Sequence, residues 1–308
     1  MNVIKLDKLK KQICQILFSV FRIFFFLTIA YVIILPFFSM VSYALRPVEQ
    51  YYDTSVVWVP KSITWDNIKQ AFDQLDYLTG LKNTVLIEVV SALITTCMCS
   101  LTAYGFSRFE FKFKKVLNFI LLLTIFIPTP MIIVSLYENF SNFDVLGIIS
   151  LINKITGSDI RVNLLNTAWT FYLPSLFSMG LRSGLCIFIY MQLFKSLPKE
   201  LEEAAAVDGA GPLRTFFNII VPSSSVAFVT VAVLSIIWHW NDYYLCVMYF
   251  NKDYPLTVSL KTVLESTKTN AVLLQMSSCL LFIAPLMVFY AIIQRRFIQS
   301  IDRVGITG

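Results

Sequence analysis

Long runs of apolar residues constrain this chain more than any other feature of its sequence. A helix needs about 20 mostly apolar residues to cross the hydrocarbon of a bilayer. Six segments meet this requirement: 16–45, 83–106, 116–136, 168–193, 226–249 and 272–293. They lack the alternation at every second residue that is typical of membrane barrels. The sequence therefore predicts an all-α membrane protein with six transmembrane helices.

Composition supports lipid as the solvent for much of this chain. Of its 308 residues, 57% are hydrophobic and 14% are charged, whereas roughly 25% are charged in an ordinary soluble domain. Even a large soluble domain leaves about a quarter of its surface in water, so a soluble core could not hide so much apolar surface. The net charge of +6 does not indicate nucleic acid binding, because the basic residues form no stripe and fall between apolar blocks.

The basic residues between the predicted spans give the expected orientation. One set of segments carries 14 of them: Lys5, Lys8, Lys10, Lys11, Arg108, Lys112, Lys114, Lys115, Lys195, Lys199, Arg214, Arg295, Arg296 and Arg303. The opposite set carries eight over longer loops: Arg46, Lys61, Lys69, Lys154, Arg161, Lys252, Lys261 and Lys268. Cytoplasmic loops are enriched in Lys and Arg. We therefore expect a multi-pass protein of the cell membrane with both termini and the 107–115 and 194–225 loops in the cytoplasm.

The order of these segments predicts the organisation of the chain. A cytoplasmic segment 1–15 precedes the first span at 16–45, which is too long for the h-region of a signal peptide, about 7–15 residues, and is interpreted as an uncleaved anchor. An external loop, 46–82, contains interfacial aromatics and turn-forming residues. A core of five spans, 83–298, includes the cytoplasmic loop 198–222, and a cytoplasmic tail covers 299–308.

The chain offers no constellation for catalysis, a metal or another cofactor. Its six cysteines have no metal-ligand spacing and lie mostly inside apolar runs, so they are interpreted as packing residues. His239, the single histidine, has no Ser, Cys or ligand partner at a recognisable spacing. The phosphate-binding pattern Gly-x-x-x-x-Gly-Lys-Ser/Thr is also absent. We expect neither an enzyme nor an ATPase.

The loop between the fourth and fifth spans has the sequence of two short helices joined at a glycine. Glu200, Glu202 and Glu203 lie in a first helical turn, where the helix dipole favours negative charge. Ala204–Ala206 favour continuation of this helix, and Gly209 allows a sharp break that a residue with a Cβ resists.

Pro212 can begin the second helix, in which apolar residues recur at helical spacing up to Ile220. A solvated loop has no physical need for Phe216 and Phe217. An exposed apolar knob formed by this pair would suit a groove on a partner protein. The alternative is that the pair packs against helices of its own chain.

The same residues resemble a known family motif. Glu203-Ala204-Ala205-x-x-Asp208-Gly209-Ala210, followed by Phe216-x-x-Ile219-x-Val221-Pro222, is similar to the EAA loop of ABC importer permeases, above all the MalG-like carbohydrate permeases. Further likeness lies in Pro198-Lys199-Glu200-Leu201-Glu202, in Trp238-His239-Trp240-Asn241-Asp242-Tyr243 and in the ending Arg303–Gly308. The resemblance covers roughly 80–308. The chain departs from the family in a longer external segment, 139–163, and in Val221, where the family often has Leu.

The resemblance implies a function, partners and functional residues. The chain would be a permease subunit of a binding-protein-dependent importer. It would have no ATPase site of its own and would be driven by a cytoplasmic ABC ATPase dimer. A second homologous permease subunit and an extracytoplasmic solute-binding protein would complete the assembly, and the solute would be a carbohydrate. The residues that would couple it to the ATPase are Glu203, Ala204, Ala205, Asp208, Gly209, Phe216 and Phe217. The rival hypothesis is a solute carrier or channel subunit of another type.

Ionisable residues inside predicted spans are costly and are therefore candidate functional groups. Glu88, Arg182 and Asp242 are such residues. Together with Trp240 and Asn241, Arg182 and Asp242 could line a path for a hydroxyl-rich solute, or the charged groups could pair to fix helix packing. Both interpretations remain open for Arg182 and Asp242, whereas packing is favoured for Glu88. Pro128, Pro130 and Pro285 predict breaks or kinks in the third and sixth spans.

Overall fold

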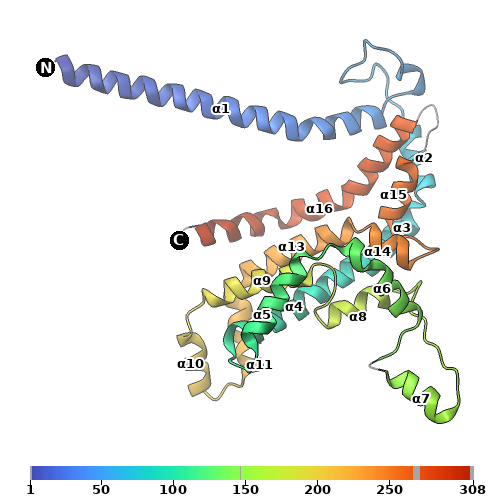
Figure 1. Cartoon of the computed structure of the whole chain (residues 1–308). Helices are drawn as coiled ribbons and strands as arrows, with labels where there is room; N and C mark the ends of the chain where they lie inside the picture. Colours follow the sequence, from blue (N-terminus) through green and yellow to red (C-terminus); the bar gives the residue numbers. More distant parts are fainter. Residues whose placement is uncertain (1, 146, 266–270, 306–308) are drawn as a thin grey trace. The chain divides into compact units, whose positions relative to one another are not determined.

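The structure is a computed structural model that describes residues 2–145, 147–265 and 271–305. Helices joined by turns and loops make up these ranges, with no strand in them (Figure 1). The chain forms two compact units. Unit 1 contains Met1–Gln74 and Val263–Ile283, and unit 2 contains Leu75–Thr262 and Ala284–Gly308. Lys268 and residues 306–308 of the predicted tail motif lie outside the described residues.

Unit 1 begins with one long helix, α1, which covers Asn2–Ala44. The predicted outer loop follows and contains the short turn η1 (Val48–Gln50) and helix α2 (Asp66–Gln74). The Thr64 amide donates to the Leu45 carbonyl at 3.0 Å, which brings the residues just before α2 back to the end of α1. The Asn67 amide group donates to the carbonyls of Ala44 at 3.1 Å and Arg46 at 2.7 Å, and so satisfies backbone groups that the end of α1 leaves unpaired.

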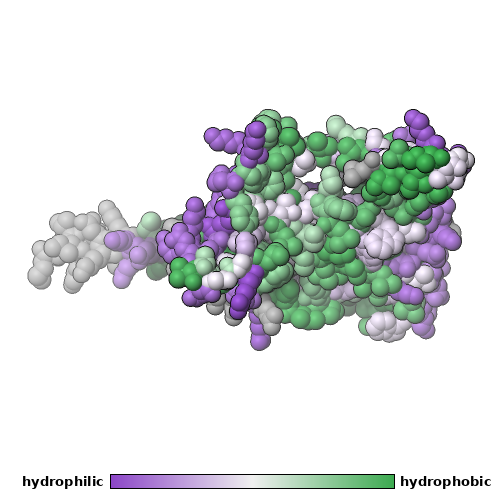
Figure 2. All heavy atoms as spheres, turned by 90° about the horizontal axis from the view of Figure 1, so that it is seen from below, coloured by the Kyte–Doolittle hydropathy of each residue, from purple (hydrophilic) through white to green (hydrophobic). Residues whose placement is uncertain are grey.

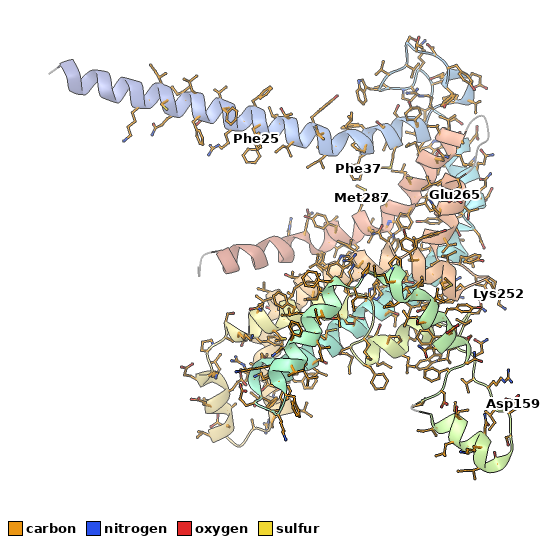
Figure 3. All side chains as sticks on the ribbon, viewed as in Figure 1. Phe25, Phe37, Asp159, Lys252, Glu265 and Met287 are labelled. Carbon is orange, nitrogen blue, oxygen red and sulfur yellow. The ribbon has the colours of Figure 1, made fainter. Side chains whose placement is uncertain are left out.

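The surface of α1 is apolar on all sides over most of its length. Large side chains from Ile13 to Val41 are exposed in the structure, and Phe25, labelled in Figure 3, is one of them. A helix that is hydrophobic all round needs a protein core or a membrane around it. Lys11–Ala44 is long and apolar enough to cross a bilayer, which agrees with the first predicted span.

Unit 2 is a bundle of helices, several of which are interrupted. In chain order the elements are α3 (Tyr77–Asn83), the π-helical turn η2 (Thr84–Val89), α4 (Val90–Arg108), α5 (Lys114–Phe126), α6 (Thr129–Ser141), α7 (Ile148–Thr156), α8 (Trp169–Leu176), α9 (Ser183–Lys195), α10 (Glu200–Val207), α11 (Pro212–Thr215), the π-helical turn η3 (Phe216–Ile220), α12 (Val221–Ser223), α13 (Ser225–Trp240), α14 (Tyr244–Tyr249), α15 (Leu256–Leu264) and α16 (Ala271–Gly305). Helix α15 continues into unit 1, and α16 begins there. Helix α4 lies at the centre of the bundle and packs against α8, α9 and α13.

Three of the described helical stretches are long and apolar enough to cross a membrane: Lys11–Ala44, Tyr77–Arg108 and Ala271–Arg295. Two bent pairs raise this number to up to five if each counts as one span. One pair, α5 with α6, bends by 103°, and the other, Pro212–Ser223 with α13, bends by 81°. The predicted count of six spans therefore stays a prediction, while several apolar membrane helices are present.

The proline predictions have different outcomes in the two helices. Pro128 lies at the break between α5 and α6, as N-cap of α6. Pro285 lies inside α16, which runs continuously from Ala271 to Gly305, so the sixth span is not broken there. A proline removes one helical hydrogen bond, and neighbouring groups in a membrane protein can compensate for that loss.

The fourth and fifth predicted spans are not the continuous helices that the sequence predicted. Helix α8 ends at Leu176, where the Met179 amide donates to the Pro174 carbonyl at 2.8 Å and Ser178 adopts a left-handed φ of 57°. This bonding pattern closes a helix end, and apolar composition alone does not reveal it. In the fifth span, α13 ends at Trp240 and α14 begins at Tyr244, so Asp242 lies in a break rather than in a helix.

Gly184 allows α5 and α9 to approach each other closely. A Cβ at this position would lie 3.5 Å from the Leu121 carbonyl oxygen and still closer to the Thr124 hydroxyl. We expect Gly184→Ala to lower the free energy of unfolding by about 1 kcal/mol, because the Thr124 hydroxyl must move away and give up its hydrogen bond to the Leu121 carbonyl. Gly105→Ala is the control, since nothing lies within 4 Å of a Cβ there. Unfolding in detergent would measure both, and equal stability of the two variants would contradict this packing.

On the face that Figure 2 shows, hydrophobic residues cover the middle of the surface and hydrophilic residues gather toward its two ends. This distribution is typical of a protein that a bilayer surrounds at mid-height.

Candidate functional site

The segment 196–224, here called the elbow, joins α9 to α13. Helix α10 ends at Val207, next to Gly209, where the sequence predicted a sharp break. The Ala210 amide donates to the Ala205 carbonyl at 2.9 Å, and the Gly209 amide donates to the Ala206 carbonyl at 3.0 Å. Gly209 has a left-handed φ of 79°, which a residue with a Cβ adopts only at a cost. The pattern satisfies carbonyls at the helix end and turns the chain toward α11.

The two phenylalanines after α11 have different environments. Phe216 is 1% exposed, and its ring centroid lies 5.1 Å from that of Tyr104 and 6.5 Å from that of Phe194. Phe217 is 57% exposed. The prediction that both form an exposed knob is therefore wrong for Phe216, which packs against its own chain. The π-helical turn η3, in which both residues lie, shifts the register by one residue within a helix.

Large apolar side chains are exposed on the elbow among polar and charged ones. Val207 is 89% exposed, and Leu213, Phe217 and Leu201 are also exposed. We call these four residues the elbow crown. Glu203, Ala204, Ala206 and Asp208 are exposed as well. Ala205, which the resemblance included among the coupling residues, is buried instead and lies two residues before the end of α10.

An ion pair connects the elbow to the end of α4. Arg108 Nε lies 2.5 Å from Glu202 Oε1, with side chains that are 6% and 18% exposed. The Tyr104 hydroxyl donates to Glu202 Oε2 at 3.0 Å, and Arg108 Nη2 donates to the Leu197 carbonyl at 3.0 Å. Two charge-assisted contacts thus converge on one carboxylate. Together with Phe216 they connect α10 and η3 to the α4–α9 pair at several points.

Sequence reasoning did not identify Arg108, Tyr104 or Glu202 as partners. It used Arg108 only for membrane orientation, and Glu202 only for the helix dipole and the family resemblance. Arg108 and Glu202 are 94 positions apart, and nothing in the local sequence pattern indicates their contact. The one sequence signal for this contact is that each residue is polar and lies near the end of an apolar run. Many other residues of the chain share this property, so it does not identify the pair.

The candidate solute-path residues lie at interruptions of helices. Trp240 and Asp242 are buried, whereas Asn241 is exposed, and the three connect α13 to α14. Asp242 Oδ1 accepts from the Leu245 amide at 3.4 Å, and the Trp240 carbonyl accepts from the Thr257 hydroxyl at 2.8 Å. The Asn241 side-chain amide donates to the Ile237 carbonyl at 2.8 Å.

Arg182 belongs to the interruption between α8 and α9 rather than to the middle of a helix. It is the N-cap of α9, with a left-handed φ of 54°, and its side chain is exposed. Its guanidinium carbon lies 5.2 Å from the centroid of the Trp238 ring, which is within the range of a cation–π interaction. The contact joins the α8–α9 interruption to α13.

Glu88 is fully buried in η2, and Cys246 Sγ of α14 lies 3.0 Å from its Oε1. This contact supports the favoured interpretation that Glu88 helps to fix helix packing, here between η2 and α14. Within the described residues no group of three or more His, Cys, Asp or Glu side chains is placed to hold a metal ion.

Comparison with known proteins gives consistent matches over most of the chain. Residues 96–303 match the family described as "Binding-protein-dependent transport system inner membrane component". The chain is 30% identical over 249 residues, 80% of its length and 82% of the relative, to "Probable starch degradation products transport system permease protein AmyC" of Thermoanaerobacterium thermosulfurigenes. It is 27% identical to "Melibiose/raffinose/stachyose import permease protein MelC" of Bacillus subtilis, over 89% of this chain and 91% of that one.

A solved structure shares the fold. It is the crystal structure of a bacterial ABC transporter involved in the import of the acidic polysaccharide alginate, matched with a TM-score of 0.70 and 18% identity over 91% of this chain and 96% of that chain. The resemblance to MalG-like carbohydrate permeases is thereby confirmed, as is the membrane location. The chain belongs to the family of binding-protein-dependent transport system inner membrane components, the multi-pass permease subunits of ABC importers.

Proposed function

We propose that this chain forms half of the translocation path of an ATP-driven importer and receives the motion of the ATPase through the elbow. Six spans would place both termini and the elbow in the cytoplasm. A cytoplasmic ABC ATPase dimer would bind the elbow crown, a second homologous permease would complete the path, and an extracytoplasmic binding protein would deliver the solute. Closure of the ATPase dimer would rock the permease halves as rigid bodies between two states.

The proposal rests on two features of the elbow together. The apolar side chains of the elbow crown are exposed, and the inner side of the elbow is bound firmly to other helices of the same chain. Val207, Leu213 and Phe217 are exposed and need a partner to cover them. Beneath them, Phe216 and the Arg108–Glu202 pair connect the elbow to α4. A push on the crown would therefore move α4 and the helices packed against it, α9 and α13.

A carbohydrate is the proposed solute. The names of relatives such as MelC and "Lactose transport system permease protein LacG" of Rhizobium radiobacter, 27% identical over 88% of this chain and 90% of that one, support this class. The proposed path follows Trp240, Asn241, Asp242 and Arg182. Interrupted helices at membrane depth are tolerated where they line a cavity or are buried in protein, and transporters often bind solutes at such interruptions.

Gly209→Val tests the coupling role of the elbow. Valine at a left-handed φ strains the turn by about 1–2 kcal/mol, so we expect loss of sugar uptake and of ATPase stimulation by the loaded binding protein. The protein should still reach the membrane. Gly211→Val is the matched control, since Gly211 has equal free space but a φ of −73°. Uptake would be measured in cells that also express the ATPase, second permease and binding protein of the same importer.

Normal transport by the Gly209→Val variant would contradict the coupling assignment. Crosslinking adds a geometric test. A cysteine at Val207 should form a disulfide with a cysteine on the ATPase surface, whereas one at the buried Ala205 should react poorly. Labelling of position 207 only from outside the cell would overturn the proposed orientation. A carrier or channel of another type would transport without the ATPase, and ATPase-independent uptake would favour that alternative.

A further inference from the structure

The segment 142–163, here called the arm, extends from the bundle as a separate feature of unit 2. Its base is closed by two backbone bonds, from the Phe143 amide to the Val162 carbonyl at 2.8 Å and from the Leu164 amide to the Phe140 carbonyl at 2.9 Å. Figure 1 shows α7 beyond the end of α6, at the opposite end of unit 2 from α10. No residue of α7 is buried.

Helix α7 is well defined at both ends. The Asp144 carboxylate accepts from the amides of Ile149 at 2.8 Å and Ser150 at 3.1 Å, and from the Ser150 hydroxyl at 2.5 Å. The Ser150 hydroxyl, together with the two amides, holds the pKa of Asp144 below its ordinary value. Gly157 ends the helix with a left-handed φ of 69°. The arm is therefore a specific structure rather than an irregular loop.

One side of α7 is an apolar stripe of four aliphatic residues. Ile148, Leu151, Ile152 and Ile155 recur at helical spacing and are between 41% and 75% exposed. At about 100° per residue they fall within roughly one third of the circumference. Such a stripe facing water along its whole length is unfavourable, since exposed apolar area costs about 25 cal/mol per Å².

The returning stretch of the arm, the residues that follow α7, bonds to the polar side of α7 and leaves the stripe open. The Asn153 side chain donates to the Ile160 carbonyl at 2.9 Å and accepts from the Ile160 amide at 3.0 Å. Asn153 lies on the side of α7 opposite the stripe, by helical periodicity. If water surrounded the arm, its returning stretch would be expected to pack over the stripe and bury it. Asp159, labelled in Figure 3, pairs with Arg161 on this stretch, and both are exposed.

We propose that the apolar stripe of the arm lies in the lipid interface of the membrane, so that α7 anchors the arm parallel to the bilayer surface. The arm begins directly after α6, part of a candidate span whose side chains Met131 and Val134 are exposed, as contact with lipid requires. Lys154 flanks the stripe and can extend its amine to the phosphates.

The composition of α7 favours lipid over a protein partner. Protein interfaces are enriched in aromatic residues, Met and Arg, and α7 contains none of these. Its stripe consists only of Ile and Leu, which are the residues that partition into hydrocarbon at low cost. The remaining residues of α7 are polar or lie beside the stripe, as in helices that lie in a membrane surface.

Photocrosslinking of the full chain tests the proposal. p-Benzoylphenylalanine would replace Leu151 or, separately, Ile155, with Ser150 on the polar side as the matched control. In vesicles of phosphatidylcholine and phosphatidylglycerol, mass spectrometry should find at least about fivefold more phospholipid adduct from 151 and 155 than from 150. The same variants in cells with the assembled transporter should give the same lipid adduct. A protein-sized adduct there, or equal lipid labelling from all three positions, would overturn the proposal.

A second measurement does not depend on the crosslinking residue. The double variant Leu151→Glu/Ile155→Glu should release the arm from the lipid, and trypsin cleavage after Lys154 in the same vesicles should accelerate about tenfold. Ile160→Glu adds a charge on the returning stretch, away from the stripe, where the Ile160 side chain is exposed and only its backbone is bonded to α7, and it should leave the cleavage rate unchanged. Identical cleavage of the native chain and the double variant would show that the stripe is not embedded, and would reject the anchor while leaving the proposed transport function untouched.

Discussion

Replacing Phe216 by alanine should destabilise the protein by about 3–5 kcal/mol, the usual cost of removing a buried phenylalanine side chain. Phe216 is almost completely buried and contacts the rings of Tyr104 and Phe194. A cavity there would loosen η3 from α4 and α9, so transport should fall together with stability. Titration of the purified chain from detergent into denaturing detergent would give the change in the free energy of unfolding.

Phe217→Ala is the matched control for this prediction, because the two residues are adjacent and differ mainly in burial. Phe217 is exposed, so its removal should change stability by less than about 0.5 kcal/mol. If it contributes to the crown that contacts the ATPase, uptake should fall without a loss of stability. A Phe217→Ala variant as unstable as Phe216→Ala would contradict the different environments of the two rings.

The local pattern was sufficient to predict the turn at Gly209 and the two helices around it. Both follow from interactions between residues a few positions apart, such as a left-handed glycine and the carbonyls that it frees. The environment of Phe216 was not predictable in the same way. Whether a ring in a short helix faces inward depends on α4 and α9, which are distant in sequence, and on the extra residue in η3.

The prediction of the membrane spans from the sequence is limited in the same way. Apolar composition predicted segments that do contain helices, because twenty apolar residues in lipid must satisfy their backbone groups internally. It could not predict the interruptions at 177–182 and 241–243, because mean hydropathy carries no information on backbone conformation, such as the left-handed φ of Ser178 and Arg182. These interruptions hold the candidate path residues, so the sequence located Asp242 and Arg182 without revealing the backbone that presents them.

Breaking the ion pair between Arg108 and Glu202 should destabilise the protein almost as much as the Phe216→Ala substitution. Removing one partner leaves the other charge largely enclosed, so Arg108→Met should destabilise the protein by up to about 3 kcal/mol. In Glu202→Met the Arg108 guanidinium would retain only the Leu197 carbonyl, with a similar cost. The double variant should be less destabilised than the sum of the two, by about 1–3 kcal/mol, because no unpaired charge remains.

Transport should respond differently from stability in this double-mutant cycle. The double variant regains part of its stability, but α10 is no longer joined to α4 through the carboxylate, so uptake should stay low. The exposed neighbour Glu203 provides the control, and Glu203→Met should leave stability within about 0.5 kcal/mol. Full recovery of uptake in the double variant would show that the pair serves folding alone. Persistent loss of uptake beside recovered stability would identify the pair as part of the mechanical connection between the elbow and the bundle.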